Sequence, residues 1–397
     1  MLENGRSDRR GLGVMVERLL APQFIALYAF AAAVLAVHFR GRVRLGFGRQ
    51  LSDHSSILAP YNVLMYLFSK VPNQPLISPR LFPELDRLRD NWQVIRDEAV
   101  ALFDQGRIKA SEGYNDWGFN SFFRSGWKRF YLKWYDDPLP SAERACPRTV
   151  DLLQSIPTIK GAMFATLSPG ARLQTHRDPY AGSLRYHLGL VTPTHPGVCR
   201  IFVDGHEYSW RDGEDLMFDE TFVHYAENTT DQTRIILFCD VERPLKTRVM
   251  TGVNRWISRH IVKETATENE AGERIGVVNK VFGSVYHVRL LGKRMKAWNS
   301  RVYYALKYSI MGATLAGIVY SVLWAVPAVA LRLPRGQAWA ALLPRRGRCG
   351  PTCSIHCLLR SPAFPASGRR SRSTIAVSLA ATTNPASWTF FCICRPA

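Results

Sequence analysis

Acidic residues are absent from the entire C-terminal part of this 397-residue chain. All 32 Asp and Glu residues lie at or before Glu273, whereas 18 of the 52 Lys and Arg residues follow it. A formal net charge of +20 ordinarily suggests a nucleic-acid partner, but here the basic excess brackets an apolar segment. The distribution therefore argues against nucleic acid and favours an anionic membrane surface as the partner.

Cysteine is also scarce over most of the chain. Only Cys146, Cys199 and Cys239 precede residue 300, and the other five lie in the last 49 residues. Three scattered cysteines exclude a disulfide framework, and we interpret them as buried thiols in a reducing compartment. No internal repeat is visible, and the length suffices for one large domain or two.

Two long uncharged runs are the clearest features that the sequence does contain. The first covers residues 19–39, a length that can span a bilayer. A signal peptide has the same basic start and apolar middle, but the cluster Arg40, Arg42 and Arg44 follows without a small-residue cleavage site. We therefore predict an N-terminal segment over 1–18 and a transmembrane helix over 19–39.

The second run, residues 309–331, is the stronger transmembrane candidate because none of its 23 residues is charged. The segment before it, residues 256–308, is rich in Lys and Arg, and we interpret it as a basic juxtamembrane segment. The positive-inside tendency places this side in the cytoplasm. Residues 332–397 show no sustained periodicity and no acidic residue, so we predict a disordered tail or an out-of-frame translation of the true C-terminus.

Between the two runs the chain divides into a membrane-proximal connector over 40–75 and a globular domain over 76–255. In the connector, Ile57–Phe68 is apolar but interrupted by Pro60. This segment is either interfacial or packed on the domain surface, because periodicity does not separate the two. Within the domain, apolar residues at spacings of three and four predict a helix over Phe82–Gly106.

Short β-prone runs dominate the chain from Gly161 to Val241. Asp204-Gly205 and Asp212-Gly213 separate some of them, and we predict a hairpin turn at each of these dipeptides. The clearest runs are Leu184–Val191, Arg200–Val203, Glu207–Trp210, Leu216–Phe218 and Arg234–Val241. Closely spaced short strands with flanking helices predict a mainly β fold, either a β-sandwich or a jelly roll.

One pattern of residues carries chemistry. His176-Arg177-Asp178 is followed 46 residues later by His224. A histidine, a carboxylate one residue removed and a distant second histidine form the ligand set of facial-triad Fe(II) oxygenases, which leaves one face of the metal open. His176 and Asp178 point the same way from an extended segment, and in a jelly roll a strand remote in sequence can supply His224. We therefore predict that these three residues bind a metal.

Basic residues near this triad predict a binding site for an anion. Arg234 opens a strongly apolar run, and a guanidinium in such surroundings requires an anionic partner. The carboxylate of a 2-oxo acid satisfies this requirement through a bidentate pair. Arg185 and His187 alternate along one strand face, which also fits an anionic ligand. For Arg185 an ion pair with Asp219 or Glu220 is an equal alternative.

Several phrases of the sequence resemble the aspartyl/asparaginyl β-hydroxylase family of Fe(II)/2-oxoglutarate oxygenases, and within it the bacterial lipid A 2-hydroxylases. The likeness runs from about residue 24 to at least residue 250. The matching phrases, which follow one another in the same order, are LAPYNVLMYLFSKVP, FPELDRLRDNWQ, FYLKWYDD, HRDPYAGSLRYHLGLVTP, YSWRDGE, MFDETFVHYAEN and LFCDVERP. The resemblance is specific because several long phrases match.

The resemblance implies a double-stranded β-helix (jelly roll) as a dioxygenase domain over 76–255, flanked by N- and C-terminal transmembrane helices. It implies that Fe(II) is held by His176, Asp178 and His224. It also implies that O₂ and the co-substrate 2-oxoglutarate are consumed. The residues expected to contact 2-oxoglutarate are Arg185, His187 and Arg234.

Two positions depart from the animal members of the family. Those enzymes lack the carboxylate ligand, whereas Asp178 is present here. The serine that contributes to their 2-oxoglutarate site aligns with Ala165, so that contact is lost or is replaced by Thr166.

By resemblance, the reaction is hydroxylation at C2 of a secondary acyl chain of lipid A. The expected location is the bacterial inner membrane, as a multi-pass protein whose catalytic domain faces the cytoplasm, with lipid A and the membrane as partners. Two alternatives stay open. The same chemistry can act on another acylated lipid, such as an ornithine lipid, or on a protein Asp or Asn side chain. A membrane-tethered jelly roll can also bind an anion without catalysis.

Overall fold

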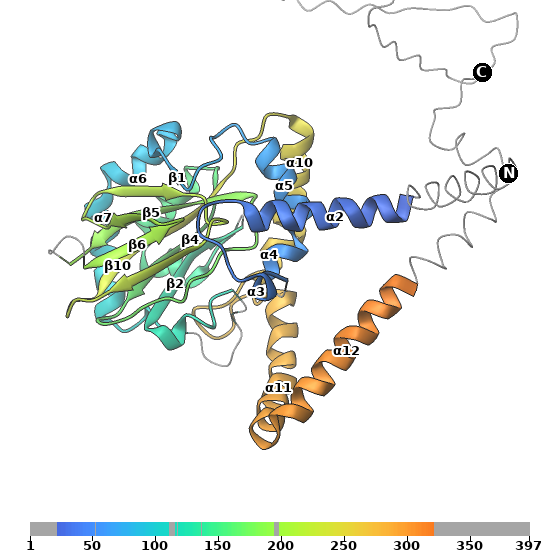
Figure 1. Cartoon of the computed structure of the whole chain (residues 1–397). Coiled ribbons are helices and arrows are strands. Elements are labelled where there is room, and N and C mark those ends of the chain that lie inside the picture. Colours follow the sequence, from blue (N-terminus) through green and yellow to red (C-terminus); the bar gives the residue numbers. More distant parts are fainter. Residues whose placement is uncertain are drawn as a thin grey trace, which may run out of the picture. The chain divides into compact units, whose positions relative to one another are not determined.

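The structure, a computed structural model, describes residues 22–320 apart from a few short gaps (Figure 1). The gaps are residue 52 and residues 111–115, 117, 136 and 194–197. The predicted segment 1–18 and the predicted tail 332–397 lie outside the described residues, as does the C-terminal half of the run 309–331.

The centre of the fold is an antiparallel sheet of seven strands in the order β1-β8-β5-β10-β4-β2-β3. The strands are β1 (Leu76–Ile77), β2 (Trp127–Trp134), β3 (Asp137–Pro138), β4 (Ile159–Leu167), β5 (Ser183–Val191), β8 (Asp215–Phe218) and β10 (Arg234–Glu242). β10 lies in the middle, and all of its residues are buried. A strand covered on both faces has a nearly continuous apolar sequence, so Arg234 at its start is an exception that needs a reason.

A second antiparallel sheet of three strands, in the order β7-β6-β9, contributes the opposite wall of the candidate site. Its strands are β6 (Cys199–Val203), β7 (His206–Ser209) and β9 (His224–Asn228). β6 and β7 are joined at Asp204-Gly205, where both φ angles are positive (50° and 85°), as a two-residue hairpin turn requires. Two antiparallel sheets with helices around them confirm the predicted mainly β fold.

The predicted β-prone runs agree closely with five strands: β5, β6, β7, β8 and β10. The hairpin predicted at Asp212-Gly213 is wrong, because the strands on either side of it, β7 and β8, belong to different sheets. This turn instead carries the chain from the small sheet to the large one. Strands β2 and β4 are not among the predicted runs, since both are buried over nearly their full length and lack alternation of polar and apolar residues.

Short helices pack against the large sheet. They are α6 (Asp86–Asp90), α7 (Trp92–Asp104), α8 (Pro140–Ala145) and α9 (Pro147–Gln154), with the 3-10 turns η1 (Pro79–Leu81), η2 (Pro83–Leu85) and η3 (Phe123–Ser125). The predicted helix over Phe82–Gly106 is interrupted at Asn91, where α6 ends and α7 begins. Within α7 the predicted face is correct, because Ile95, Ala99 and Leu102 are buried.

Further helices form a layer beside the sheets: α2 (Pro22–Phe39), α3 (Phe47–Leu51), α4 (His54–Ile57), α5 (Ala59–Leu67) and α10 (Arg248–Ile257). α5 contacts both α2 and α10 (Figure 1). Its first residue, Ala59, packs against the buried Ala33, Val34 and Val37 of α2. Ile57–Phe68 thus packs on the helical layer with one side, while Ile57, Leu64 and Leu67 stay exposed, so both interpretations that the sequence allows remain open.

After α10 the chain continues through the π-helical turn η4 (Ser258–Val262) and the 3-10 turn η5 (Lys263–Thr265) to α11 (Val277–Trp298) and α12 (Ser300–Tyr320). Within the part of the chain that the structure describes, no helix has both the length and the apolar character needed to cross a membrane. The transmembrane helices predicted over 19–39 and 309–331 are therefore not confirmed.

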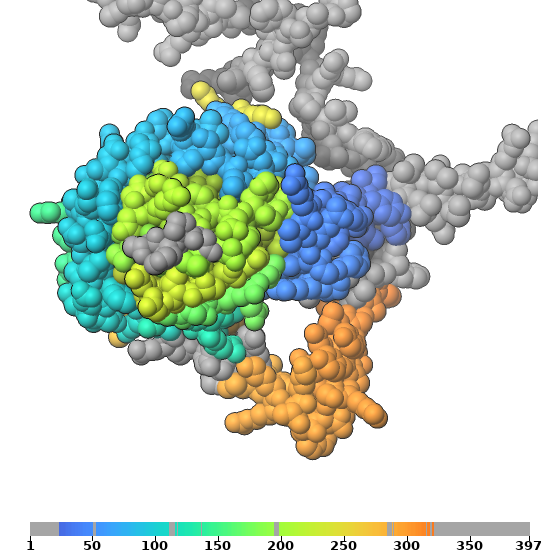
Figure 2. Space-filling model, turned by 60° about the vertical axis from the view of Figure 1, so that its left-hand side comes forward, coloured from blue at the N-terminus to red at the C-terminus, as the bar shows by residue number. Residues whose placement is uncertain are grey.

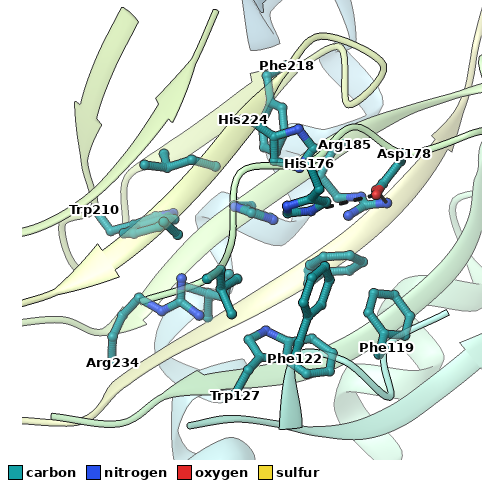
Figure 3. Close-up of a pocket in the computed structure, with 16 residues that line it drawn as sticks. Phe119, Phe122, Trp127, His176, Asp178, Arg185, Trp210, Phe218, His224 and Arg234 are labelled. Atoms are coloured by element: carbon teal, nitrogen blue, oxygen red, sulfur yellow. Dashed lines mark hydrogen bonds and ion pairs between the residues drawn. The ribbon is translucent and has the colours of Figure 1, made fainter. Parts of the chain in front are cut away.

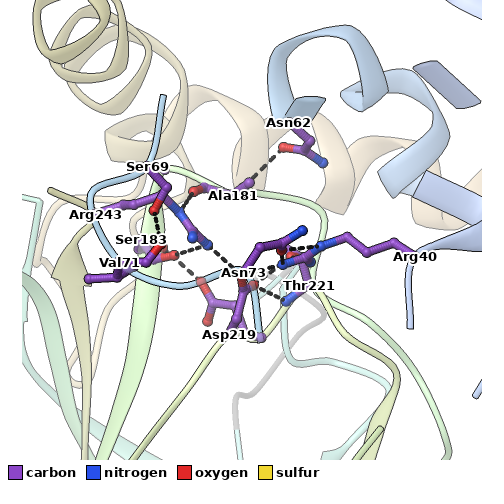
Figure 4. Close-up of polar contacts among 12 residues, drawn as sticks. Arg40, Asn62, Ser69, Val71, Asn73, Ala181, Ser183, Asp219, Thr221 and Arg243 are labelled. Atoms are coloured by element: carbon purple, nitrogen blue, oxygen red, sulfur yellow. Dashed lines mark hydrogen bonds and ion pairs between the residues drawn. The ribbon is translucent and has the colours of Figure 1, made fainter. Parts of the chain in front are cut away.

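A buried network of charges fixes the connector to the sheet (Figure 4). Asp219, directly after β8, accepts hydrogen bonds from Arg40 Nη2 at 2.6 Å and from Arg243 Nη2 at 2.7 Å. Burial raises the pKa of a carboxyl group, but these two guanidinium groups outweigh burial and hold the pKa of Asp219 well below its usual range. Arg40 also lies 3.8 Å from the ring centroids of Tyr66 and Phe222. The loop between β8 and β9 is thereby attached to the N-terminal helices.

Candidate metal centre

The three predicted metal ligands converge at one end of a pocket between the two sheets (Figure 3). One side-chain donor atom each from His176, Asp178 and His224 lies within 4.8 Å of the others. The backbones of the two histidines pair directly, with the His176 amide donating to His224 at 3.0 Å and the return bond at 2.8 Å. The segments that carry the ligands are thus neighbours joined by hydrogen bonds, and the pairing fixes the spacing of the two rings.

Each histidine ring is held in the tautomer that a metal ligand needs. Nδ1 of His176 donates to the carbonyl of Gln174 at 2.7 Å, and Nδ1 of His224 donates to the carbonyl of Phe222 at 2.9 Å. A carbonyl can only accept, so the proton of each neutral ring is on Nδ1 and the Nε2 lone pair is free. Such outer hydrogen bonds orient metal-binding imidazoles.

The protonation states also fit a metal. Burial lowers the pKa of His176, and burial together with the neighbouring His176 lowers the pKa of His224 to about 3, so both rings are neutral at pH 7. Burial raises the pKa of Asp178, but Arg185 and the two histidines outweigh it, so the net pKa is lowered and the side chain is a carboxylate. Two neutral imidazoles and one carboxylate fit Fe(II) in the facial-triad arrangement.

Arg185 lines the pocket beside Asp178 and is surrounded by carboxylates. Its Nη2 lies 2.9 Å from Asp178 Oδ2, its Nε lies 2.9 Å from Asp240 Oδ1, and it also pairs with Glu220. Burial raises the pKa of Glu220 well above its usual range and also raises that of Asp240, because one guanidinium does not neutralise three carboxylates. Of the two alternative ion pairs considered for Arg185, the one with Glu220 is present. Asp219 instead pairs with Arg40 and Arg243. The predicted contact of Arg185 with 2-oxoglutarate stays a prediction.

The other end of the pocket is formed by Arg234, His187 and Trp210. Among the residues that the structure describes, Nε of Arg234, both ring nitrogens of His187 and Nε1 of Trp210 are buried without hydrogen-bond partners. The Arg234 guanidinium lies 4.4 Å from the Trp210 ring centroid, and burial lowers its pKa to about 10. A buried, unpaired guanidinium is costly, so this end of the pocket has the character of an anion site.

Aromatic and aliphatic side chains make up most of the remaining wall. The apolar lining residues are Phe119, Phe122, Trp127, Leu173, Ile201, Phe218, Ala226, Ile236 and Phe238. The Phe122 ring centroid is 4.6 Å from that of His176, so the apolar wall begins directly beside the metal ligands. Thr166 pairs in register with Ile235, whereas the pocket-lining Ile236 pairs with Ala165. Side chains alternate along a strand, so Thr166 lies on the face away from the pocket and does not replace the missing serine.

All six residues predicted from the sequence line this single pocket. The sequence assigned no role to Trp210 or Asp240, and it gave Glu220 only as one of two alternative partners of Arg185. Trp210 stands in the phrase YSWRDGE and Asp240 in LFCDVERP, so the signal for these two residues was present only as resemblance. Nothing in their spacing indicates that Asp240 contacts Arg185 or that Trp210 lies beside Arg234.

Comparison with known proteins agrees with this geometry. The family model described as aspartyl/asparaginyl beta-hydroxylase matches residues 89–244, which include every predicted site residue. An ornithine lipid ester-linked acyl 2-hydroxylase of Rhizobium tropici is 33% identical over 192 residues, which cover 48% of this chain and 68% of that protein. The chain belongs to the aspartyl/asparaginyl β-hydroxylase family. The resemblance inferred from the sequence is thereby confirmed.

Other members of the family match over shorter shares of their length. Human aspartate beta-hydroxylase domain-containing protein 2 is 30% identical over 218 residues, 51% of this chain and 57% of that protein. Human aspartyl/asparaginyl beta-hydroxylase is 28% identical over 191 residues, 45% of this chain and 24% of that protein. The chain thus spans between about a quarter and two thirds of the three relatives described. These relatives and the family model support a hydroxylase.

Proposed function

We propose that this family member is an Fe(II)- and 2-oxoglutarate-dependent hydroxylase of a lipid acyl chain. One observation carries the proposal. A single pocket holds three convergent metal-ligating side chains and, among its described lining residues, a buried arginine without an anionic partner. The chemistry that Fe(II) supplies when bound is the coupling of O₂ and 2-oxoglutarate to hydroxylation of a C–H bond.

In this proposal one end of the pocket binds the metal and the other end binds 2-oxoglutarate. His176, Asp178 and His224 hold the metal, and Arg185 keeps the Asp178 carboxylate in place through the 2.9 Å contact. Arg234 binds the far carboxylate of 2-oxoglutarate, which replaces the missing ion pair and restores the guanidinium to its usual pKa. His187 and Trp210 offer further nitrogen atoms to the same anion.

The wall beside the metal ligands supports an acyl chain as substrate. Its lining is formed by apolar side chains such as Phe119, Phe122 and Trp127, with Phe122 against His176. A methylene chain gains from such surroundings, whereas the carboxylate or amide of an Asp or Asn substrate needs polar partners. We therefore favour a lipid over a protein side chain.

Lipid A, hydroxylated at C2 of a secondary acyl chain, is the substrate that the sequence phrases support. An ornithine lipid is the second candidate, because the Rhizobium tropici relative is an ornithine lipid acyl 2-hydroxylase. Both substrates present an acyl chain at a membrane surface. We further propose the cytoplasmic face of the bacterial inner membrane as the location, where reduced iron and 2-oxoglutarate are supplied.

Mass spectrometry of lipids tests the function and distinguishes the substrates. Lipids from cells with and without the gene are compared, and the expected difference is a gain of one oxygen atom confined to one lipid class. A shift in lipid A supports the first candidate, and a shift in ornithine lipid supports the second. Unchanged lipid profiles, together with a hydroxylated protein Asp or Asn, would overturn the lipid assignment.

A further inference from the structure

Large apolar side chains are exposed on the helical layer formed by α2, α4, α5 and α10. On α2, every residue from 25 to 32 is exposed, although none is charged, and Ile25 is 52% exposed. Only the C-terminal half packs on the domain, through Ala33, Val34 and Val37. The N-terminal half therefore projects from the layer with an apolar surface on all sides (Figure 1). An apolar helix without a covering surface requires one.

α10 has one broad apolar face, and the domain covers only one edge of it. Met250 and Asn254 face the domain, where the Tyr61 hydroxyl donates to Asn254 Oδ1 at 2.6 Å. Val249, Val253 and Trp256 recur at spacings of four and three, so they form a stripe along the helix. Val249 is 69% exposed and Trp256 58% exposed. A short helix with an outward apolar stripe is typical of a segment that lies in a membrane interface.

α5 connects these two surfaces. It packs against α2 at Ala59 and against α10 through Tyr61. Its outer residues Leu64 and Leu67 are exposed, as is Ile57 at the end of α4. Figure 2 shows the N-terminal helices standing beside the rounded β domain rather than covering it. α2, α4, α5 and α10 lie together beside the sheets (Figure 1), and each of them carries exposed large apolar side chains.

The charge of this layer is of one sign. No Asp or Glu occurs between Glu17 and Asp53, nor between Glu242 and Glu264. Both stretches are basic, and their exposed Lys and Arg residues in the described part of the chain are Arg42, Arg44, Arg49, Lys246, Arg248, Arg255 and Arg259, whereas Arg40 and Arg243 are held in the buried network around Asp219. Exposed apolar side chains within a basic, acid-free sequence match the surface of an anionic bilayer, whose headgroups are negative and whose interior is apolar.

The same layer is attached to the loop that carries the metal ligands. Arg177, between two of the ligands, donates from Nη1 to the carbonyl of Val37 in α2 at 2.7 Å. Arg49 of α3 donates from Nη2 to the carbonyl of Thr175 at 2.7 Å. A bilayer that covers the layer would therefore lie next to the candidate metal centre.

We propose that the outer stripe of α10, the exposed edge of α4 and α5, and the projecting half of α2 form a docking surface for an anionic phospholipid bilayer, with α10 lying in the interface. This inference rests on the proposed function in one respect, since it supplies the surface from which a lipid substrate reaches the site. Its occupant is the bilayer and not a protein partner.

Photo-crosslinking tests this docking surface in the full-length chain. p-Benzoylphenylalanine is placed at Val253 or Trp256 of α10, and in separate variants at Ile25 of α2 and at Phe103 of α7. Phe103 is a large exposed apolar residue outside the layer and serves as the matched control. Each variant is reconstituted in vesicles of phosphatidylglycerol and phosphatidylethanolamine, illuminated and analysed by mass spectrometry.

The expected result is a phospholipid adduct at Val253, Trp256 and Ile25 but not at Phe103. Replacing phosphatidylglycerol by phosphatidylcholine should lower the yield at Val253 roughly fivefold, because the basic side chains lose their counter-charge. An adduct at Ile25 without one at Val253 or Trp256 overturns the docking of α10. Adducts only to another protein in native membranes, or no adduct at any position, overturn the whole surface.

Hydroxylation of detergent-dispersed lipid by the same variants separates this proposal from the proposed function. If the variants hydroxylate the dispersed lipid but show no adducts in vesicles, the docking surface is wrong and the lipid hydroxylase stands. If adducts form and no lipid is hydroxylated, the docking surface stands and the substrate assignment is wrong.

Discussion

At the scale of single residues, the candidate metal centre is prepared by hydrogen bonds to groups around it. Two backbone carbonyls set the tautomers of His176 and His224, and Arg185 keeps Asp178 ionised despite its burial. Each ligand therefore already has the charge and the lone pair that a divalent metal requires. The site needs little rearrangement to accept Fe(II).

Removing a ligand should abolish metal binding and activity. We expect Asp178→Ala and His224→Ala to lower iron content and iron-dependent succinate release by roughly 100-fold or more, because changes even to the groups behind a ligand cost up to about that factor. Asp231→Ala, a change at an exposed carboxylate between β9 and β10, is the control. Iron measured by mass spectrometry and succinate by chromatography provide independent readouts. Full activity of Asp178→Ala would remove this residue from the ligand set.

Replacing Arg234 should affect the co-substrate and not the fold. This buried guanidinium lacks an anionic partner among the described residues. Arg234→Met therefore removes the free-energy cost of burying an unpaired charge in the protein without bound 2-oxoglutarate. We expect an unchanged or higher unfolding temperature but a KM for 2-oxoglutarate raised roughly 30-fold or more, the loss expected for one partner of a buried charge pair. Arg200→Met is the control, since Arg200 on β6 is already paired with Glu227 at 2.8 Å. An unchanged KM would contradict the assignment.

At the scale of secondary-structure elements, the loop between β8 and β9 is fixed at both ends. His224 begins β9, and Asp219 at the other end of the loop is held by Arg40 and Arg243. These two arginines come from the connector and from the segment after β10, so the ion pairs join elements that are far apart in sequence. Loss of the ion pairs should loosen the layer of N-terminal helices and the metal site together.

Asp219→Asn tests this coupling through stability and its pH dependence. Breaking a fully buried ion pair costs about 3–5 kcal/mol, so we expect the free energy of unfolding in urea at pH 7 to fall by about that amount. The folded pKa of Asp219 is depressed, so its contribution is complete above the unfolded pKa of ~3.9 and is lost as the pH falls below it, where the unfolded chain binds the proton first. Asp219→Asn should therefore lose less stability on acidification than the parent.

The control for this experiment is Asp212→Asn, at an exposed turn residue whose carboxylate accepts hydrogen bonds only from Thr192 among the described residues. This variant should have the same free energy of unfolding in urea as the parent, both at pH 7 and after acidification. Equal stability of Asp219→Asn and the parent at pH 7 would contradict a structural role of the network.

Several elements were predictable from the sequence and others were not, for physical reasons. The runs at β5 to β8 either alternate polar and apolar residues or have turn residues at their ends. The positions of these strands could therefore be predicted from the local sequence. The helix over Phe82–Gly106 was predicted as continuous, because periodicity does not register the break at Asn91. The turn at Asp212-Gly213 has hairpin chemistry, but which sheet a strand joins depends on pairing far along the chain. Local residues do not specify that pairing.

At the scale of the whole molecule, the convergence of His176, Asp178 and His224 and the burial of Arg234 could be predicted, whereas most of their surroundings could not. The triad has a known ligand spacing, and a lone arginine before an apolar run signals a buried charge. Glu220 was one of two alternative partners of Arg185, but the sequence did not indicate that Asp178 and Asp240 contact the same guanidinium. Glu220 and Asp240 reach Arg185 through the pairing of β5 with β8 and β10, which local residues do not specify.

We expect the C-terminal tail, residues 333–397, to be dispensable for the reaction. Every residue that lines the pocket lies between Phe119 and Phe238. A chain ended after Arg332 should therefore retain succinate release within about twofold of the full-length protein, since substitutions remote from a site seldom change its energetics by more than ~0.5 kcal/mol. Activity of the purified truncated chain in detergent checks this. A loss greater than tenfold would assign the tail a role in the enzyme.

The proposed reaction of this pocket is the hydroxylation of a lipid acyl chain with O₂ and 2-oxoglutarate. The most direct measurement incubates the purified protein with Fe(II), 2-oxoglutarate, lipid A or ornithine lipid, and isotopically heavy O₂, and then locates the label by tandem mass spectrometry. We predict one heavy oxygen atom at C2 of an acyl chain, with succinate formed in equal amount, and no label with Asp178→Ala or Arg234→Met at low 2-oxoglutarate. Succinate release without labelled lipid, or label independent of 2-oxoglutarate, would contradict the account.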